Sequence, residues 1–163
     1  MTAPFRLRRF APADQDAARC LILEGMKGHW GEVDESLNPD LLDIAGSFRD
    51  GAFWVAAQDG RVIGTGGWRW RAPRTVEITR MSVAATCRRS GVGRALLQRL
   101  MRDACDRGAT RVCLETNAGW SGEIAFYEAS PFGPILWFER SCEEITRAPD
   151  NGGTTCQTLQ KMS

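Results

Sequence analysis

A glycine-containing loop rich in arginine is the segment of this sequence best suited to chemistry. It stands between an expected strand and an expected helix and reads Arg88-Arg89-Ser90-Gly91-Val92-Gly93-Arg94. The first amides of a helix have no acceptor within the helix, and the helix dipole adds positive potential there. Gly91 and Gly93 let an anion approach the backbone closely. The loop therefore predicts a phosphate site; the alternative is an ordinary glycine-rich helix start with solvated arginines.

Spacing excludes two other kinds of phosphate-binding loop. The sequence contains no G-x-x-x-x-G-K-[ST] pattern, so the segment is not the loop of P-loop nucleotide hydrolases. It is not the G-x-G-x-x-G dinucleotide fingerprint either, because Leu96 stands where the third glycine belongs. A short glycine loop is a weak signal alone, so its meaning depends on the elements around it.

The elements that must position this loop predict a mixed sheet with helices on its faces. Strands are expected at 5–10, 53–58, 61–70, 75–83, 111–116, 135–139 and, weakly, 154–160; helices are expected at about 12–25, 39–49, 91–107 and 122–129. Asp59-Gly60 is typical of a tight hairpin turn. Hairpins combined with helical crossovers give an α/β (α+β) fold with a mixed, largely antiparallel central sheet flanked by helices. The 163 residues fit a single domain, 1–163.

Composition argues against several classes of protein. A net charge of +1 gives no support for a nucleic-acid partner. No apolar run reaches the roughly 20 residues that span a bilayer, and the first ten residues lack the apolar stretch of a signal peptide. No membrane association and a cytoplasmic location, with free cysteine thiols, are therefore expected. Because no C-x-x-C pair occurs and His29 is the one histidine, no metal is expected.

The loop and a second segment downstream resemble the GNAT (general N-acetyltransferase) superfamily. Residues 88–93 match its central motif, [R/Q]-x-x-G-x-[G/A], and Met81-Ser82-Val83 matches the apolar-x-Val pattern of the strand before it. About 30 residues further on, an expected strand is followed by Phe126-Tyr127-Glu128, which matches the family's aromatic-Tyr-Glu run. The resemblance covers about residues 5 to 132 and implies the acyl-CoA N-acyltransferase fold.

In proteins that this chain resembles, the pyrophosphate of coenzyme A lies on the loop and the pantetheine arm lies along the preceding strand. The resemblance thus implies acetyl-CoA as co-substrate, without a metal, and these cofactor-binding residues: Met81, Ser82, Val83, Arg88, Arg89, Ser90, Gly91, Val92, Gly93, Arg94 and Tyr127. It implies acetyl transfer to a primary amine of a small molecule or peptide, by direct attack in a ternary complex. The alternative is a non-catalytic acyl-CoA-binding sensor module on the same fold. A homodimer is left open.

Tyr127 and Glu77 are the candidate catalytic residues. Tyr127 matches the family tyrosine near the coenzyme sulfur, where a phenol can donate a proton to the departing thiolate; a simple contact with the coenzyme and a core aromatic are the alternatives. Glu77 lies on the strand before the motif, where some family members carry a glutamate that acts as base. Strict alternation puts every second residue from 77 to 83 on one face, unless a bulge intervenes. The alternative for Glu77 is an ion pair with Arg69 or Arg71.

The acceptor region is expected to form from loop 26–38, the hairpin and the C-terminal strands. The loop holds a histidine, a tryptophan and three acidic residues, which suit a cationic amine, although a solvated loop is favoured for this composition: His29, Trp30, Glu32, Asp34 and Glu35. The sequence also departs from the family pattern. Trp120 and Glu123 stand where many members have asparagine and a small residue, and Pro131-Phe132 replaces a Gly-Phe pair.

Overall fold

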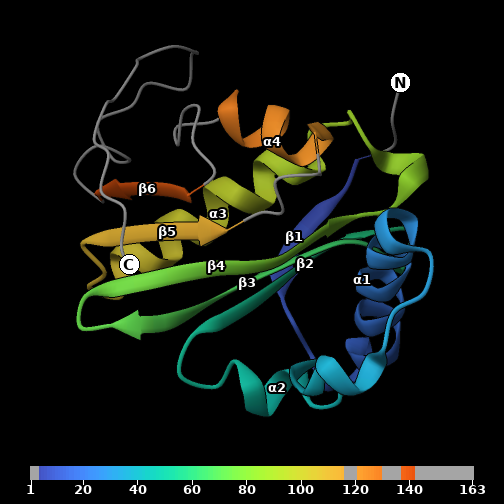
Figure 1. Cartoon of the computed structure of the whole chain (residues 1–163), viewed down its shortest axis with the longest axis horizontal. Coiled ribbons are helices and arrows are strands. Elements are labelled where there is room, and N and C mark those ends of the chain that lie inside the picture. Colours follow the sequence, from blue (N-terminus) through green and yellow to red (C-terminus); the bar gives the residue numbers. More distant parts are fainter. Residues whose placement is uncertain (1–3, 116–120, 130–136, 142–163) are drawn as a thin grey trace.

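The computed structural model describes residues 4–115, 121–129 and 137–141, whose strands form one six-stranded sheet (Figure 1). In spatial as well as chain order the strands are β1 (Arg6–Arg9), β2 (Ala52–Gln58), β3 (Arg61–Ala72), β4 (Thr75–Val83), β5 (Arg111–Glu115) and β6 (Trp137–Ser141). β4 and β5 run parallel, and the other neighbours run antiparallel. The expected mixed, largely antiparallel sheet is therefore confirmed.

Helices cover both faces of this sheet. The α-helices of the described residues are α1 (Gln15–Trp30), α2 (Ile44–Ser47), α3 (Val92–Asp106) and α4 (Ser121–Glu128). In Figure 1, α1 and α2 lie on one side of the strands, while α3 and α4 lie on the other. No helix of the described residues is long and apolar enough to cross a membrane.

The alternation of β2 shows how one strand serves two apolar layers. Phe53 and Val55 pack with α1 and α2, in a cluster that includes Ile22 and Ile44. Ala52, by contrast, is buried on the α3 side. Because successive strand side chains point to opposite faces, a continuous apolar run indicates a strand that is covered on both sides.

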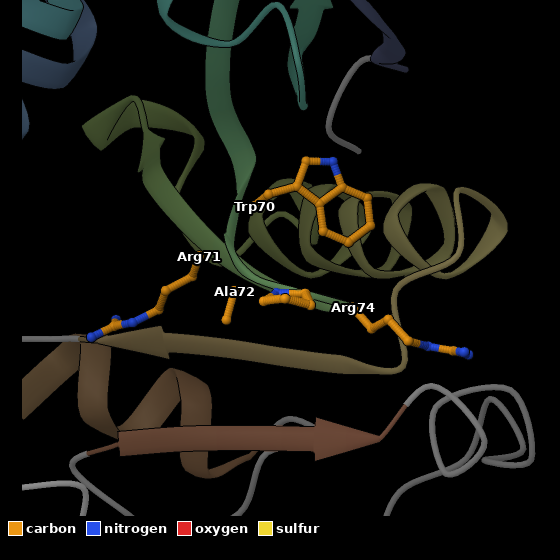
Figure 2. A pocket seen from close by; sticks show the side chains of 5 residues that line it. Trp70, Arg71, Ala72 and Arg74 are labelled. Carbon is orange, nitrogen blue, oxygen red and sulfur yellow. The ribbon is translucent and has the colours of Figure 1, made fainter.

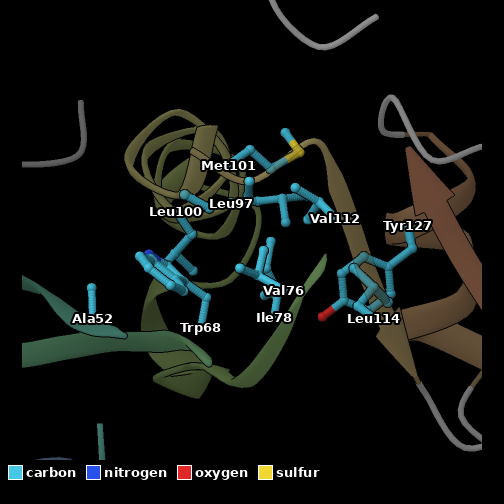
Figure 3. Close-up of a cluster of buried hydrophobic side chains, with 12 residues drawn as sticks. Ala52, Trp68, Val76, Ile78, Leu97, Leu100, Met101, Val112, Leu114 and Tyr127 are labelled. Carbon is cyan, nitrogen blue, oxygen red and sulfur yellow. The ribbon is translucent and has the colours of Figure 1, made fainter. Parts of the chain in front are cut away.

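The core on the α3 side joins strands β3, β4 and β5 to α3 and α4 (Figure 3). Its fully buried members include Trp68, Val76, Leu100 and Leu114. The Trp68 indole N–H donates to the Asp103 carboxylate of α3 at 2.7 Å. This buried polar contact fixes the helix over the middle of the sheet.

The first helix is longer than the sequence indicated. Pro12–Asp14 forms a 3₁₀ turn, and α1 then runs to Trp30, so residues 26–30 belong to a helix and not to the expected loop. Gly31 ends the helix: its φ is 76°, and its N–H donates to the Lys27 carbonyl. A left-handed glycine is a common helix stop, and here it lies six residues beyond the expected end.

The expected helix 39–49 is also wrong, because it is divided into two short pieces. Pro39–Leu41 is a 3₁₀ turn and α2 starts at Ile44. The Asp43 carboxylate accepts from the Gly46 N–H, which caps a new helix start, and the Gln15 side chain accepts from the Ile44 N–H. Side-chain hydrogen bonds of this kind offer the backbone an alternative to a continuous helix.

Differences elsewhere are small or concern the cysteines. The expected strand 135–139 is found at Trp137–Ser141, and the weak strand 154–160 lies outside the described residues. Cys20, Cys87 and Cys113 are free thiols. Cys105 is disulfide-bonded, so the expectation of free thiols throughout is wrong at this position.

Candidate functional site

Strand β4 loses one of its two neighbours halfway along. Its pairing with β5 runs from Thr75 opposite Arg111 to Ile78 opposite Leu114, whereas its pairing with β3 continues to Val83. Within the described residues no strand lies on the β5 side of residues 79–83, which we call the open edge. Unpaired N–H and C=O groups along a strand edge can pair with an extended ligand as if with an added strand.

A bulge at Arg80 changes the direction of the side chains along this edge. Ser82 pairs with Thr65 and Thr79 pairs with Gly67, so two residues of β4 oppose one of β3. Arg80 adopts a left-handed φ of 58°, and its carbonyl accepts from the Thr65 hydroxyl at 2.9 Å. A bulge adds one residue and so reverses the alternation beyond it.

The expected shared face of residues 77, 79, 81 and 83 is therefore wrong. Met81 and Val83 pack with core clusters on the α3 side. Val76 and Ile78 are buried on that same side, so Glu77 between them points to the opposite face. Ser82 also points away from α3, because its hydroxyl donates to the Leu21 carbonyl of α1.

A nearly buried ion pair holds the bulge in place. The Arg80 guanidinium donates to both carboxylate oxygens of Asp40, at 2.6 and 2.8 Å, and to the Asn38 side-chain oxygen at 3.1 Å. The Arg80 and Asp40 side chains are only 18% and 12% exposed. This bidentate ion pair connects the segment before α2 to the open edge.

The loop before α3 leaves backbone N–H groups available for an anion. Gly91 lies at the N-cap with a φ of 87°, and no side chain caps the helix. The first intrahelical bond is donated by the Ala95 N–H to the Gly91 carbonyl, so the amides of residues 92–94 have no acceptor within the helix. The expected cradle of donors is present, in a helix of 15 residues.

Arginines surround this helix start and the loop is tightly turned. Arg88, Arg89 and Arg94 are all exposed, and Arg89 adopts a left-handed φ of 62°. The Ser90 hydroxyl donates to the Cys87 carbonyl, which closes the turn. Among the described residues no acidic side chain forms an ion pair with these three arginines, so their charges can converge on a phosphate.

Helix α4 packs against the start of α3. A Cβ placed on Gly93 would lie 3.4 Å from the Phe126 ring. The neighbouring Tyr127 is 7% exposed and belongs to the core cluster that contains Ile78 and Leu114. Since these two residues form the last pair between β4 and β5, Tyr127 lies where the open edge begins; Figure 3 shows its hydroxyl directed toward β4.

The environment of Tyr127 keeps its phenol protonated. Burial raises the Tyr127 pKa above its usual value, and the negative charge of Glu123 raises this pKa further. Both effects disfavour the phenolate. The hydroxyl is therefore suited to donating a hydrogen bond.

Glu77 lies in the paired part of β4, opposite Cys113. The Arg71 guanidinium contacts its carboxylate at 3.2 Å, so the ion pair that was the alternative for Glu77 is present. The Glu77 side chain is 26% exposed. The geometry thus brings Tyr127 to the start of the open edge but places Glu77 before it, on the other face.

Sequence reasoning missed one polar contact near Tyr127. The His29 Nε2 atom lies 2.8 Å from a Glu123 carboxylate oxygen, which joins the last turn of α1 to the first turn of α4. No local feature of the sequence indicates this contact, because the two residues are 94 positions apart.

A shallow pocket lies away from the open edge. Five residues at the end of β3 and in the turn that follows line it: Trp70, Arg71, Ala72, Pro73 and Arg74 (Figure 2). The turn is at the opposite end of β4 from the open edge. In the described residues no group of three or more His, Cys, Asp or Glu side chains could hold a metal ion.

Solved structures of acetyltransferases share this fold. A GNAT-family acetyltransferase of Staphylococcus aureus Mu50 superposes with a TM-score of 0.75 at 17% identity, covering 85% of this chain and 99% of that one. The PaiA N-acetyltransferase of Thermoplasma acidophilum, solved in complex with coenzyme A, gives a TM-score of 0.68 at 15% identity, with 85% and 99% covered.

Curated relatives are similar over part of their length. The chain is 34% identical over 107 residues to a probable N-acetyltransferase family 8 member 5 of Mus musculus, which covers 61% of this chain and 47% of that protein. It is 36% identical over 111 residues to a probable N-acetyltransferase camello of Xenopus laevis, with 65% and 51% covered. The chain thus spans about half the length of these relatives. The family model for GNAT acetyltransferases matches residues 19–133, and the chain belongs to that family.

Proposed function

We propose that this chain transfers an acetyl group from acetyl-CoA to a primary amine, by direct attack in a ternary complex. The observation that carries the proposal is the continuity of three features. The uncapped start of α3 leads to the open edge of β4, and that edge begins beside the buried Tyr127 hydroxyl. An anion site, a strand edge and a hydrogen-bond donor in this order suit a long phosphorylated thioester.

The donor would bind through backbone groups for most of its length. Its pyrophosphate would accept hydrogen bonds from the amides of residues 92–94, with charge from Arg88, Arg89 and Arg94. The pantetheine arm would pair with the β4 backbone at Met81, Ser82 and Val83. A backbone N–H near the bulge would polarise the thioester carbonyl, as an oxyanion site does.

Tyr127 would donate a hydrogen bond to the sulfur of the leaving coenzyme A thiolate. The raised pKa of Tyr127 lies above that of a thiol, which is about 8.5, so complete proton transfer from the phenol to a thiolate is unfavourable. A protonated phenol in a water-poor site still stabilises the developing negative charge. The proton that the thiolate finally takes would come from the amine nitrogen after it attacks the carbonyl carbon.

Glu77 would remove the first proton from the acceptor's ammonium group. Because Glu77 lies before the open edge and pairs with Arg71, we propose that it acts through a water molecule. The acceptor is a small molecule or a peptide amine.

The test is release of free thiol from acetyl-CoA with a panel of amines: an alkylamine, an arylalkylamine, a diamine and a peptide with a free N-terminus. We expect Tyr127→Phe to lower kcat about 100-fold with little change in the Kd of acetyl-CoA. We expect Glu77→Gln to lower kcat about 10- to 100-fold, with the loss smaller at high pH, where the amine deprotonates unaided.

Two results would contradict the proposal in different ways. Acetyl-CoA binding by calorimetry without turnover of any amine would favour the alternative, a non-catalytic sensor of acyl-CoA. Absence of both binding and turnover would remove the donor assignment itself.

A further inference from the structure

A hydrogen bond between His29 and Glu123 connects two elements from opposite faces of the sheet. His29 belongs to α1, which packs on one face, and Glu123 belongs to α4, which packs with α3 on the other. Their side chains are 26% and 35% exposed and 2.8 Å apart. The open edge of β4, beside which the described residues place no further strand, is a place where elements from the two faces can meet.

The course of α1 explains how His29 reaches this opening. The Leu21 carbonyl accepts from the Ser82 hydroxyl at 3.3 Å, and a Cβ on Gly25 would lie 2.9 Å from that same hydroxyl oxygen. Residues four apart lie on the same side of a helix, so His29 follows Leu21 and Gly25 by one further turn. Helix α1 thus passes β4 at Ser82 and carries His29 beyond the open edge.

Glu123 also lies close to Tyr127, the residue proposed to contact the coenzyme sulfur. It precedes Tyr127 by four residues on α4, and its charge contributes to the raised pKa of Tyr127. The His29–Glu123 contact therefore lies near the beginning of the open edge, close to the position proposed for the thioester and within reach of an amine that attacks it.

The Glu123 carboxylate has capacity for a second partner. One of its oxygens contacts the His29 Nε2 atom, and His29 is its hydrogen-bond partner among the residues that the structure describes. A carboxylate accepts at both oxygens, so the other oxygen can accept from an ammonium group. A charge-assisted bond of this kind is among the stronger hydrogen bonds in proteins.

We propose that Glu123, positioned by His29, binds the cationic nitrogen of the acceptor. This inference rests on the proposed function and names the group that recognises the acceptor. Glu123 is the acceptor-binding residue, and His29 is a positioning residue that fixes one carboxylate oxygen. A carboxylate at this position favours amines without an adjacent carboxylate, since like charges repel.

The single histidine of the chain provides a direct measurement of binding. Its imidazole gives one set of side-chain proton signals in an NMR spectrum. The position of these signals reports on the contact between His29 and Glu123. The protein is saturated with coenzyme A, the product, so that no transfer occurs, and is titrated at constant pH with an alkylamine, an arylalkylamine and a diamine. We expect at least one amine to shift the His29 signal in a saturable way.

Variants then separate recognition from other roles. Glu123→Gln keeps the shape and loses the charge, so we expect the Kd of that amine, and its KM in the thiol-release assay, to rise about 10- to 100-fold. His29→Gln should raise them less, about 3- to 10-fold, because the carboxylate remains. The exposed Glu128 on the same helix is the matched control, and Glu128→Gln should change neither value.

Three outcomes would overturn the inference. One is a His29 signal that no amine shifts at millimolar concentrations. Another is an amine Kd unchanged in Glu123→Gln. The third is an effect of Glu123→Gln on acetyl-CoA affinity alone, which would mean that the pair closes over the donor. Failure of the proposed function looks different: amines would shift the signal, but no thiol would be released.

Discussion

Within the part of the chain that the structure describes, residues 75–78 of β4 lie between two strands, whereas residues 79–83 lie beside one. The paired half contributes Val76 and Ile78 to the core, at 0% and 3% exposure. The open half instead carries a bulge, a left-handed arginine and partly exposed side chains. One strand thus serves two purposes: its first half holds β5 and α3 in place, and its second half offers backbone groups to a ligand.

The largest expected effect is a loss of stability in the paired half of β4. Trp68, opposite Ile78 in the sheet, is fully buried and bonded to Asp103. Trp68→Ala should lower the free energy of unfolding by about 3–5 kcal/mol, because a large cavity opens and the partly buried Asp103 carboxylate loses its indole donor, although Arg9 still contacts it. Denaturant unfolding measures this loss. The comparison predicts that folded protein of this variant still binds acetyl-CoA within about 2-fold of the parent; a much weaker Kd would show that the two halves are not separable.

A substitution beside the open half should cost less stability than Trp68→Ala but weaken acetyl-CoA binding more. Among the residues that the structure describes, Asp40→Ala leaves the Arg80 guanidinium with the Asn38 oxygen and the Met26 sulfur as hydrogen-bond acceptors. We expect a loss of about 2–3 kcal/mol, at the low end for a broken buried pair because both side chains are partly exposed. We expect the Kd of acetyl-CoA to rise about 10-fold or more as the bulge relaxes, since an open edge binds by its backbone geometry.

Asp43→Ala is the matched control for that experiment. Asp43 lies three residues further along the same segment and caps α2 through the Gly46 N–H. Its loss should cost about 1 kcal/mol of stability without touching the bulge. If Asp43→Ala weakens acetyl-CoA binding as much as Asp40→Ala does, the ion pair has no particular role at the open edge.

The sequence predicted the paired regions better than the open edge, for a physical reason. Alternating and continuous apolar runs indicated β2, β3, β4 and α3 nearly to the residue, because burial dictates those patterns. The bulge at Arg80 has no such pattern: nothing local requires a left-handed arginine, and the residues that hold it there, Asp40 and Asn38, lie 40 and 42 positions away. An expectation from alternation alone therefore put Met81 and Glu77 on one face.

The site residues divide in the same way. The helix start at Gly91 was predictable because its amides are a local property of the chain. Tyr127 was found through a family resemblance, and its burial beside Ile78 and Leu114 depends on the fold. The contact of His29 with Glu123 spans 94 residues, and neither side chain indicates the other in the sequence.

A small effect on stability is also expected from a pair of glycines at the two ends of α3. Gly91 and Gly108 adopt φ values of 87° and 92°, and a Cβ would meet nothing within 4 Å at either position. Alanine at each should therefore cost the same, about 1–2 kcal/mol, for a left-handed backbone that alanine disfavours. Only Gly91→Ala should also weaken acetyl-CoA binding, about 10-fold, because strain there turns the amides of residues 92–94 away from the pyrophosphate. Calorimetry then measures the Kd of acetyl-CoA for each variant, and the two values can be compared because both variants lose the same stability. Equal affinities would mean that the donor's phosphates do not use the start of α3, and the open edge would then have to hold the donor without an anion site.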